Sequence, residues 1–292
     1  MVLTSPHTDT TNGIIYTWNA ADSGNKRVRV GGRDAAYTSP DVTIPDTLDV
    51  EQNGSAPWQV WFVGGLNGNT TILSIILPKF IKKLGPSAFN GASIQQVDFS
   101  QCTILNGVNT SCFANSNIKS IDMTNCPILK IIGAYTFNSC SGLTKVIMPH
   151  VTTLHDTAFS GAVPVEELNL NSMTTITPVK VSGIIDSSLK IISLNSMTVH
   201  PDIFSYFTLL EDLSLNAIPS ITATTLNGIG SSLKIISLDS VTNLGLDPDT
   251  FSNYPALEEL SLNSLTSFIS TTLTGGVPTL KKISLNSIIN FG

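Results

Sequence analysis

The sequence predicts an α/β-type solenoid that is mostly β, with a single parallel sheet on one face and irregular or short helical turns on the other. The main observation is the pattern apolar-x-x-apolar-x-apolar, which recurs at steps of 21 to 25 residues. Charged residues make up only 12% of the 292-residue chain, against a usual share of about 25%. Hydrophobic residues make up 41%, so the chain can bury a long core. The pattern begins at Ile72, Ile94, Ile118, Leu143, Val165, Leu189, Leu210, Leu233, Leu257 and Leu280.

Ten units of this length and pattern are typical of leucine-rich repeats, in which each unit gives one short strand that stacks in parallel on its neighbours. We count the first apolar residue of each unit as position one. Because strand side chains alternate between faces, positions four and six point inward, and positions three, five and seven point outward. We also expect one aromatic ring per coil on the convex side. The phenylalanines at that place are Phe89, Phe113, Phe137, Phe159, Phe204 and Phe251.

Position two alternates in charge in the C-terminal half. Neighbouring parallel strands lie about 4.8 Å apart, so each charge is expected to face an opposite charge on the next coil. A slip by one coil would oppose like charges, so the alternation favours a single register. The residues are Glu166, Lys190, Glu211, Lys234, Glu258 and Lys281.

The two ends of the chain differ from the repeats. We expect residues 1–12 to be disordered or tag-like, residues 13–70 to form a β-rich N-terminal cap, and residues 71–292 to form the leucine-rich repeat solenoid. The cap should contain strands over 13–18, 27–30, 42–45 and 58–63, and it would cover the edge of the first coil. The last unit stops at Gly292 with no capping segment. This predicts that the natural chain continues or that two copies meet there as an end-to-end homodimer.

Composition and motifs exclude several classes of function. The net charge of −6 repels phosphate backbones, so we expect no nucleic-acid partner, and no apolar run is long enough for a membrane-spanning segment. No metal-ligand spacing, phosphate-binding loop or nucleophile–base constellation occurs, so we predict no metal, no cofactor and no catalysis. His150 and His155 share a coil. We interpret them as solvated loop residues, with a weak metal pair as the alternative.

Two smaller features leave alternatives open. Cys102 and Cys126 both occupy position nine of adjacent coils, where they either form a disulfide or stay reduced in the core, which we favour. A basic cluster in the cap is either a solvated outer face, which we favour, or a patch that docks a partner. Its members are Lys26, Arg27, Arg29 and Arg33.

The outward strand columns are the candidate binding site, since extended solenoid faces are used for binding. Short polar side chains at positions five and seven would offer hydrogen bonds to a protein or a glycan. The alternative is that they bond along the stack and only keep the face soluble. Ile191 and Ile235, exposed at position three, favour contact with a ligand. The candidate residues are Asn169, Asn171, Ser193, Asn195, Ser214, Asn216, Ser237, Asp239, Ser261 and Asn263.

The phrases Ile75-Ile-Leu-Pro78, Leu84-Gly-Pro-Ser-Ala-Phe89, Ile132-Gly-Ala-Tyr-Thr-Phe137 and Val146-Ile-Met-Pro149 resemble the BspA-type leucine-rich repeats of bacterial surface proteins. The resemblance is good over residues 13 to about 160, whereas beyond Val165 the phrase Leu-Asn-Ser replaces Leu-Pro. It implies an exported protein at the cell surface or secreted, although no secretory signal is visible at the N-terminus. It also implies adhesion to host matrix proteins or other cells. We therefore predict a non-enzymatic binding module, with a structural spacer or assembly segment as the alternative.

Overall fold

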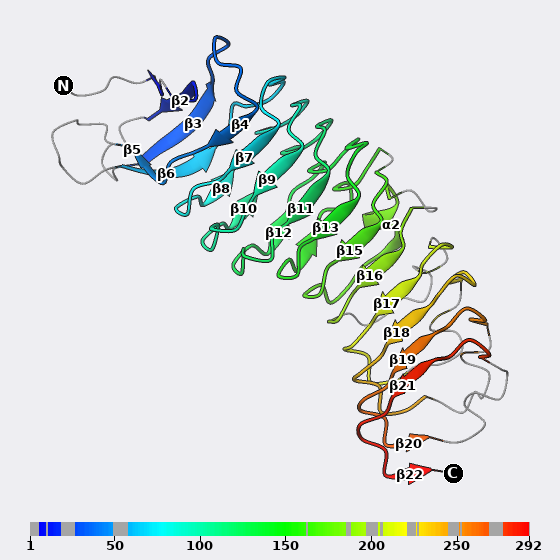
Figure 1. Cartoon of the computed structure of the whole chain (residues 1–292). Helices are drawn as coiled ribbons and strands as arrows, with labels where there is room; N and C mark the ends of the chain where they lie inside the picture. The colour runs from blue at the N-terminus through cyan, green and yellow to red at the C-terminus, as the bar shows by residue number, and fades with distance from the viewer. Residues whose placement is uncertain are drawn as a thin grey trace. The chain divides into compact units, whose positions relative to one another are not determined.

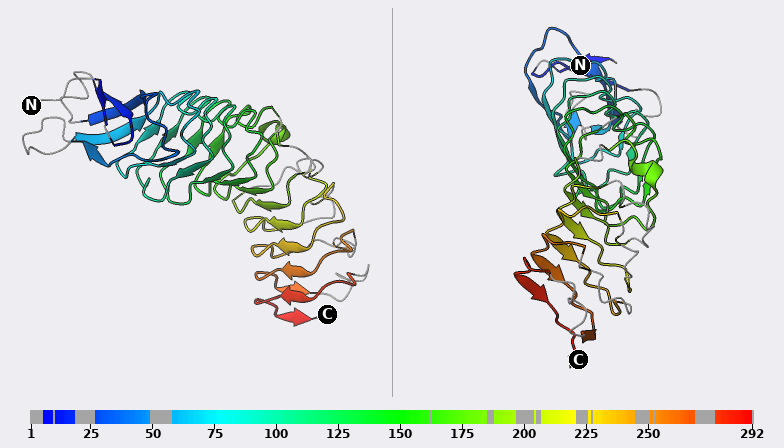
Figure 2. Two further views of the ribbon diagram at one scale, coloured as in Figure 1. Left: turned by 45° about the horizontal axis from the view of Figure 1, so that its top comes forward. Right: turned by 90° about the vertical axis from the view of Figure 1, so that its right-hand side faces the viewer.

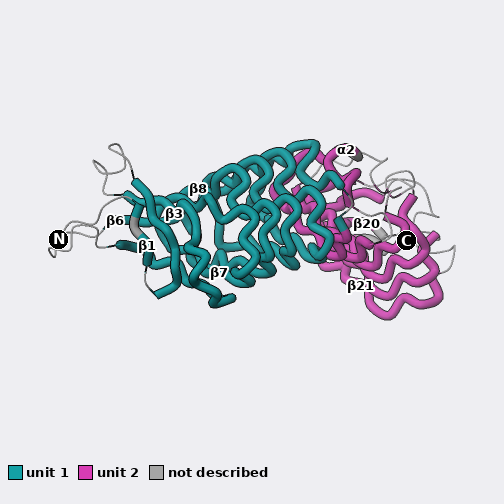
Figure 3. Tube along the Cα trace, turned by 90° about the horizontal axis from the view of Figure 1, so that it is seen from above, with its two compact units in different colours: residues 1–163 teal, residues 164–292 magenta. Residues whose placement is uncertain are grey.

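The computed structural model confirms a mostly β leucine-rich solenoid, built from parallel strands with almost no helix in the part that it describes (Figure 1). The chain divides into two compact units, residues 1–163 and residues 164–292 (Figure 3). The sequence prediction did not contain this boundary. The structure describes residues 6–9, 11–18, 27–48, 58–161, 163–184, 188–196, 204, 207–220, 226, 228–244, 251, 253–268 and 277–291.

Unit 1 begins with a small mixed sheet. The strands β1 (His7–Thr8), β2 (Ile14–Thr17) and β3 (Arg27–Arg33) pair antiparallel in chain order, and β3 pairs in parallel with β6 (Trp58–Val63). The short β5 (Thr47–Leu48) lies antiparallel to β6. The four strand segments expected in the cap are thus observed as β2, β3, β4 (Asp41–Thr43) and β6. Two residues of the segment expected to be unstructured form β1.

The repeats of unit 1 carry two strand columns, where the sequence predicted one sheet. The first column contains β4, β7 (Ser74–Ile76) and β9 (Gln96–Asp98), with β11 (Ser120–Asp122) and β13 (Lys145–Ile147) on later coils. The second column continues from β6 through β8 (Lys83–Leu84), β10 (Gly107–Val108), β12 (Ile131–Ile132) and β14 (Thr153–Leu154). Each coil therefore has two straight sides, and their strands bury one side chain over the core, except in β9, where Val97 is half-buried.

The expected aromatic column is present in unit 1. The rings of Phe89 and Phe113 stack with centroids 5.2 Å apart, those of Phe113 and Phe137 at 5.9 Å, and those of Phe137 and Phe159 at 5.3 Å. All four side chains are buried. Stacked aromatic pairs contribute about 0.5–1.5 kcal/mol beyond burial, so the row links consecutive coils as well as filling their interior.

Unit 2 carries one parallel column of three-residue strands in strict register (Figure 2). The register aligns equal repeat positions, so that Leu168, Ile192, Leu213, Ile236 and Leu260 follow one another at position four. Position six is buried in the same way, and the backbone amides of Leu194, Leu215 and Leu238 each bond to a carbonyl of the next coil. The predicted inward and outward positions are therefore confirmed. The six strands are β15 (Glu167–Asn169), β16 (Ile191–Ser193), β17 (Asp212–Ser214), β18 (Ile235–Ser237), β19 (Glu259–Ser261) and β21 (Lys282–Ser284).

The remaining elements of unit 2 are short. The only helix in the described residues is α2 (Pro178–Val181), one turn long, and β20 (Ser267–Phe268) pairs in parallel with β22 (Asn290–Phe291). Phe204 and Phe251 are buried, as expected for the aromatic position.

Candidate functional site

The candidate residues lie together on the outward face of the unit 2 sheet. Register places Asn169, Ser193, Ser214, Ser237 and Ser261 side by side at position five. We call the rows at positions five and seven the polar columns. Their side chains are half-buried, because each lies against the next coil.

The polar columns form a hydrogen-bonded ladder along the stack. Asn216 is typical. Its Oδ1 accepts from the backbone amide of Asp239 at 2.8 Å and from the hydroxyl of Ser237 at 3.0 Å, and its Nδ2 donates to Ser214 Oγ at 3.1 Å. One coil earlier, Asn195 Oδ1 accepts from Asn216 N at 3.0 Å and from Ser214 Oγ at 2.7 Å. These amide oxygens are thus engaged within the protein and stabilise the register of the coils.

The same pattern extends in both directions. Asn171 Oδ1 accepts from the amide of Asn195 at 3.2 Å. Asp239 Oδ1 accepts from Ser261 Oγ and, at 2.9 Å, from Asn263 Nδ2. The row ends at Asn263, whose own Oδ1 is buried without a hydrogen-bond partner.

Position three carries apolar and acidic side chains on the outward face. Ile191 and Ile235 are 38% and 36% exposed, and the register places Asp212 between them. The Asp212 carboxylate forms no hydrogen bond or ion pair within the described residues. Partial burial raises its pKa, and the nearby Glu259 carboxylate adds to the increase. An ionised carboxylate in this position is therefore poorly compensated.

A shallow cavity of about 90 Å³ lies next to this triplet. It is lined by Ile235, Ser237, Glu259, Ser261 and Lys282, with further backbone and core atoms. Glu259 and Lys282 form an ion pair at 3.0 Å across it. The cavity can accept one small side chain or sugar substituent, with apolar, hydroxyl and charged groups within reach.

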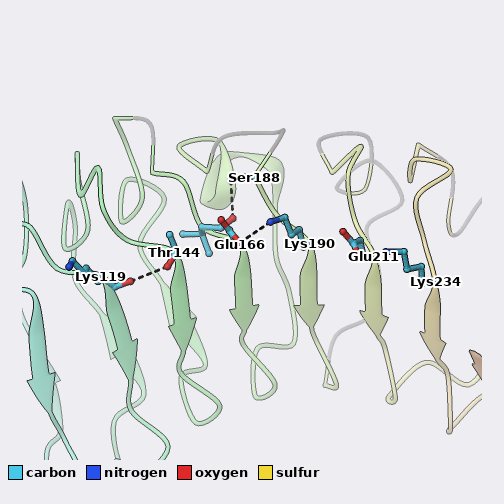
Figure 4. Close-up of polar contacts among 8 residues, drawn as sticks. Lys119, Thr144, Glu166, Ser188, Lys190, Glu211 and Lys234 are labelled. Atoms are coloured by element: carbon cyan, nitrogen blue, oxygen red, sulfur yellow. Dashed lines mark hydrogen bonds and ion pairs between the residues drawn. The ribbon is translucent and has the colours of Figure 1, made fainter.

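Position two shows the predicted alternation of charge. Three of the expected contacts are ion pairs, between Lys190 and Glu166 at 2.9 Å, Lys234 and Glu211 at 2.6 Å, and Lys281 and Glu258 at 2.9 Å. Figure 4 shows the first pair, with Glu211 and Lys234 on the following coils. Each lysine binds the glutamate of the preceding coil. The hydrogen bond from Lys234 lowers the pKa of Glu211, with further lowering from the charges of Lys234 and Lys190.

The cysteines are reduced in the structure, the state that the sequence analysis favoured. All four are buried, and burial raises the pKa of each thiol, to about 12 for Cys126 and about 11 for Cys140. Cys140 Sγ donates to the carbonyl of Phe113 at 3.0 Å. Thiols of this kind are poor nucleophiles, because the reactive species is the thiolate.

The two histidines of one coil do not converge. His150 Nε2 lies 3.0 Å from the carbonyl of Thr124, and His155 Nδ1 lies 3.0 Å from Thr157 Oγ1. Within the described ranges no group of three or more His, Cys, Asp or Glu side chains could hold a metal ion. In the same part of the chain no helix is long and apolar enough to cross a membrane.

Unit 1 has an acidic hollow that sequence reasoning missed. A cavity of about 340 Å³ is lined mainly by Asp98, Ser100, Asp122, Thr124 and Asn125. Each carboxylate accepts a hydrogen bond from the backbone two residues further on and so stabilises the turn that follows it. Asp98 accepts from the amide of Ser100 at 2.7 Å, and Asp122 accepts from the amide of Thr124 at 3.0 Å. Asp98 and Asp122 both occupy position five of adjacent units. The repeat register could therefore have predicted that the two carboxylates lie on neighbouring coils.

Solenoid architecture, an apolar core and an outward ladder of Asn and Ser define this protein as a leucine-rich repeat solenoid. More particularly, it carries BspA-type repeats, because residues 67–181 match the family described as BspA type Leucine rich repeat region, in six copies. A comparison with curated proteins finds no match.

Several solved structures are similar to the chain. One is the pneumococcal vaccine antigen PcpA, with 18% identity, a TM-score of 0.48, and coverage of 100% of this chain and 88% of that one. Another is a leucine-rich repeat protein from Bacteroides ovatus, with 18% identity, a TM-score of 0.42, and coverage of 98% and 91%. A third is a leucine rich cell surface protein from Faecalibacterium prausnitzii, with 14% identity, a TM-score of 0.35, and coverage of 97% and 95%.

Proposed function

We propose that the chain is a non-enzymatic binding or adhesion module of a bacterial cell-surface or secreted protein, which recognises protein or glycan ligands through the outward strand face of unit 2. The observation that carries this proposal is the triplet Ile191, Asp212 and Ile235 at position three. Two exposed isoleucines flank a carboxylate that has no hydrogen bond or ion pair within the described residues, and this combination is costly for a surface that only faces water.

The polar columns support the same face in a different way. Their side chains are rigid because the ladder holds them, so little side-chain entropy is lost when a ligand covers them. Some hydrogen-bonding capacity remains, since the hydroxyl oxygen of Ser214 has a second lone pair and the Asn216 amide nitrogen has a second hydrogen. In this proposal the side chains at position three make the main contacts with the ligand, and the polar columns contribute hydrogen bonds around them.

The test uses an array of purified extracellular-matrix proteins and glycans, probed with the wild-type chain and two variants. Ile235→Asp places a second carboxylate on the face, and Ile128→Asp, at a 47% exposed isoleucine of unit 1, is the matched control. We expect at least one array component to bind the wild-type chain and the control equally, and Ile235→Asp roughly tenfold more weakly, about 1.4 kcal/mol. If no component binds the wild-type chain, or if Ile235→Asp binds as the wild type does, the proposal fails.

Substitutions in the polar columns are less suitable for this test. Asn195→Arg and Asn216→Arg would remove acceptors that hold the next coil, so a loss of binding could follow from a loss of structure. Ile235 is exposed, and its apolar side chain forms no hydrogen bond to a neighbouring coil. Its substitution therefore tests the loss of binding separately from the loss of structure.

A second candidate function is assembly through the last described coil. Ile283, 37% exposed, lies in β21, which is the last strand of its sheet within the described residues, and Ile289, 78% exposed, directly precedes β22. An edge strand of this kind can pair with another chain. This candidate predicts a dimer in light scattering that Ile289→Lys converts to a monomer. A monomeric wild-type chain at micromolar concentration would contradict it.

A further inference from the structure

A second face of the molecule, in unit 1, gathers positive charge. It is the outward side of the second strand column, which runs from β3 through β6, β8 and β10 to β12 (Figure 1). Its cations lie on β3 or beside β8 and β12, and two aromatic residues lie on β6. We call this surface the basic face and define it by Arg27, Arg29, Trp61, Phe62, Lys82, Lys83 and Lys130.

The pairing register shows that Arg29, Phe62 and Lys83 share one side of the sheet. Arg29 faces Phe62, Phe62 faces Lys83, and Lys83 faces Gly107. The next residue of each strand is buried, as for Val30, Val63, Leu84 and Val108. Since strand residues alternate between faces, Arg29, Lys83 and the Phe62 ring project away from the core.

Glycines keep this face flat. The ring of Phe62 lies over Gly85, where an added Cβ would collide with it. The stem of Lys83 lies across Gly107, with Cγ 3.4 Å from the place of a Cβ there. Side chains thus lie along the sheet and leave a broad, shallow surface of rings and alkyl stems.

The aromatic residues are in contact with the cations. The guanidinium carbon of Arg27 lies 5.6 Å from the centroid of the Trp61 ring, and that of Arg29 lies 5.2 Å from it and 5.7 Å from the Phe62 ring. Such cation–π contacts orient the guanidinium groups on the face.

Within the described residues, this face carries more cationic than acidic side chains. The described strands of the column and the residue before each short strand contain no acidic residue, and in the described structure Arg27, Lys82, Lys83 and Lys130 form no ion pair. Unit 1 as a whole has ten basic and ten acidic residues, so its cations are concentrated on one side rather than in excess. Unit 2 has five basic and eleven acidic residues and carries the whole net charge of −6.

We propose that the basic face binds an anionic polysaccharide whose sulfate or carboxylate groups recur along a chain, a ligand site that goes beyond the proposed function of unit 2. Arg29 of β3 and Lys83 of β8 stand two strands apart in the sheet, hence roughly 10 Å. A polysaccharide with one charged group per disaccharide has a repeat of this order. Double-stranded DNA, with one charge per about 1.7 Å, is far denser than the array of cations.

The rings complete the fit to a sugar. The C–H faces of pyranose rings pack against flat aromatic surfaces, and Trp61 and Phe62 lie between the cations of β3 and those of β8. The ligand therefore runs across the strands, with its sugar rings over β6 and its anionic groups at the flanking cations.

The experiment measures binding of the full chain to immobilised heparin, as a sulfated probe, and to hyaluronate, as a carboxylated probe. Dextran is the neutral control, and an oligo(dT) strand is a polyanion of another class. We expect heparin, hyaluronate or both to bind more tightly than oligo(dT), dextran to give no binding, and the affinity to fall as salt is raised. The pair of charged probes distinguishes a sulfated from a carboxylated ligand.

Three variants test whether the ligand binds at the basic face. Lys83→Glu should weaken the interaction roughly tenfold and Lys83→Gln by a smaller factor, since the first adds repulsion to the loss of a contact. Lys119→Glu is the matched control, because this exposed lysine precedes β11 in the other column of the same unit. Circular dichroism melts of all three variants confirm folding. Failure of both charged glycans to bind, equal binding by Lys83→Glu and Lys119→Glu, or oligo(dT) binding as tightly as the glycans would each overturn the proposal.

Discussion

Replacing Asn216 by alanine tests whether the polar columns hold the coils together. The substitution removes two acceptor contacts to the next coil and one donor contact to Ser214. A typical hydrogen bond contributes about 0.5–1.5 kcal/mol net, and an amide left without a partner costs about 1–3 kcal/mol. The backbone amide of Asp239 loses its acceptor, but water reaches this half-buried row. We therefore expect Asn216→Ala to lower the free energy of unfolding by about 2 kcal/mol.

The matched control is Asn286→Ala. Asn286 occupies the same repeat position on the last described coil, where it is exposed and makes no hydrogen bond with the described residues. This substitution should change stability by less than about 0.5 kcal/mol. Urea unfolding followed by far-UV circular dichroism measures both variants, and hydrogen exchange in the segment 233–244 reports the affected coil directly. Equal midpoints for Asn216→Ala and Asn286→Ala would refute the ladder as a source of stability.

Three further predictions follow from other contacts. Phe113 stacks on two rings and Phe159 on one, so Phe113→Leu should cost about 1 kcal/mol more than Phe159→Leu in urea unfolding, and equal costs would contradict the stack. Glu211→Lys should lower the melting temperature mainly in low salt. Since Lys234 lowers the pKa of Glu211, this stabilisation is present above the ordinary carboxyl pKa and is lost as pH falls through the lowered folded value, and a salt-independent effect would contradict it. Asp212→Asn should raise the melting temperature at pH 7. Because burial raises the pKa of Asp212, its penalty is complete above the raised folded pKa and disappears below the ordinary carboxyl pKa, so a difference that persists at pH 3 would contradict this cause.

The strands of the first column could be predicted because their signal is strictly periodic. Each lies at positions three to five of its unit, as in β7 after Ile72 and β18 after Leu233. The second column could not be found in this way. Its buried residues Leu84, Val108, Ile132 and Leu154 stand 12, 14, 14 and 11 residues after the first residue of their units. A two-residue strand has no alternation to recognise, and its offset varies with the length of the preceding turn.

The polar columns illustrate a different limit. The sequence placed their members in rows, and register alone was sufficient for that. It left open whether the amide groups face a ligand or one another, because this depends on distances of a few tenths of an ångström between side chains. The bonds from Asp239 N and Ser237 Oγ to Asn216 Oδ1 show that these atoms serve the stack. The proposed recognition therefore falls to position three, where the residue type changes from coil to coil.

The basic face shows why net charge is a poor guide to the partners of a solenoid. A chain of net charge −6 would be expected to repel any polyanion. Yet at physiological ionic strength a charge is screened over about 8 Å, which is less than the spacing of two or three strands. If the proposal holds, a ligand lying on β6 and β8 senses chiefly the charges on these strands and their neighbours, such as Arg27 and Lys83. In a repeat protein, charge has to be counted coil by coil and face by face before a class of ligand is excluded.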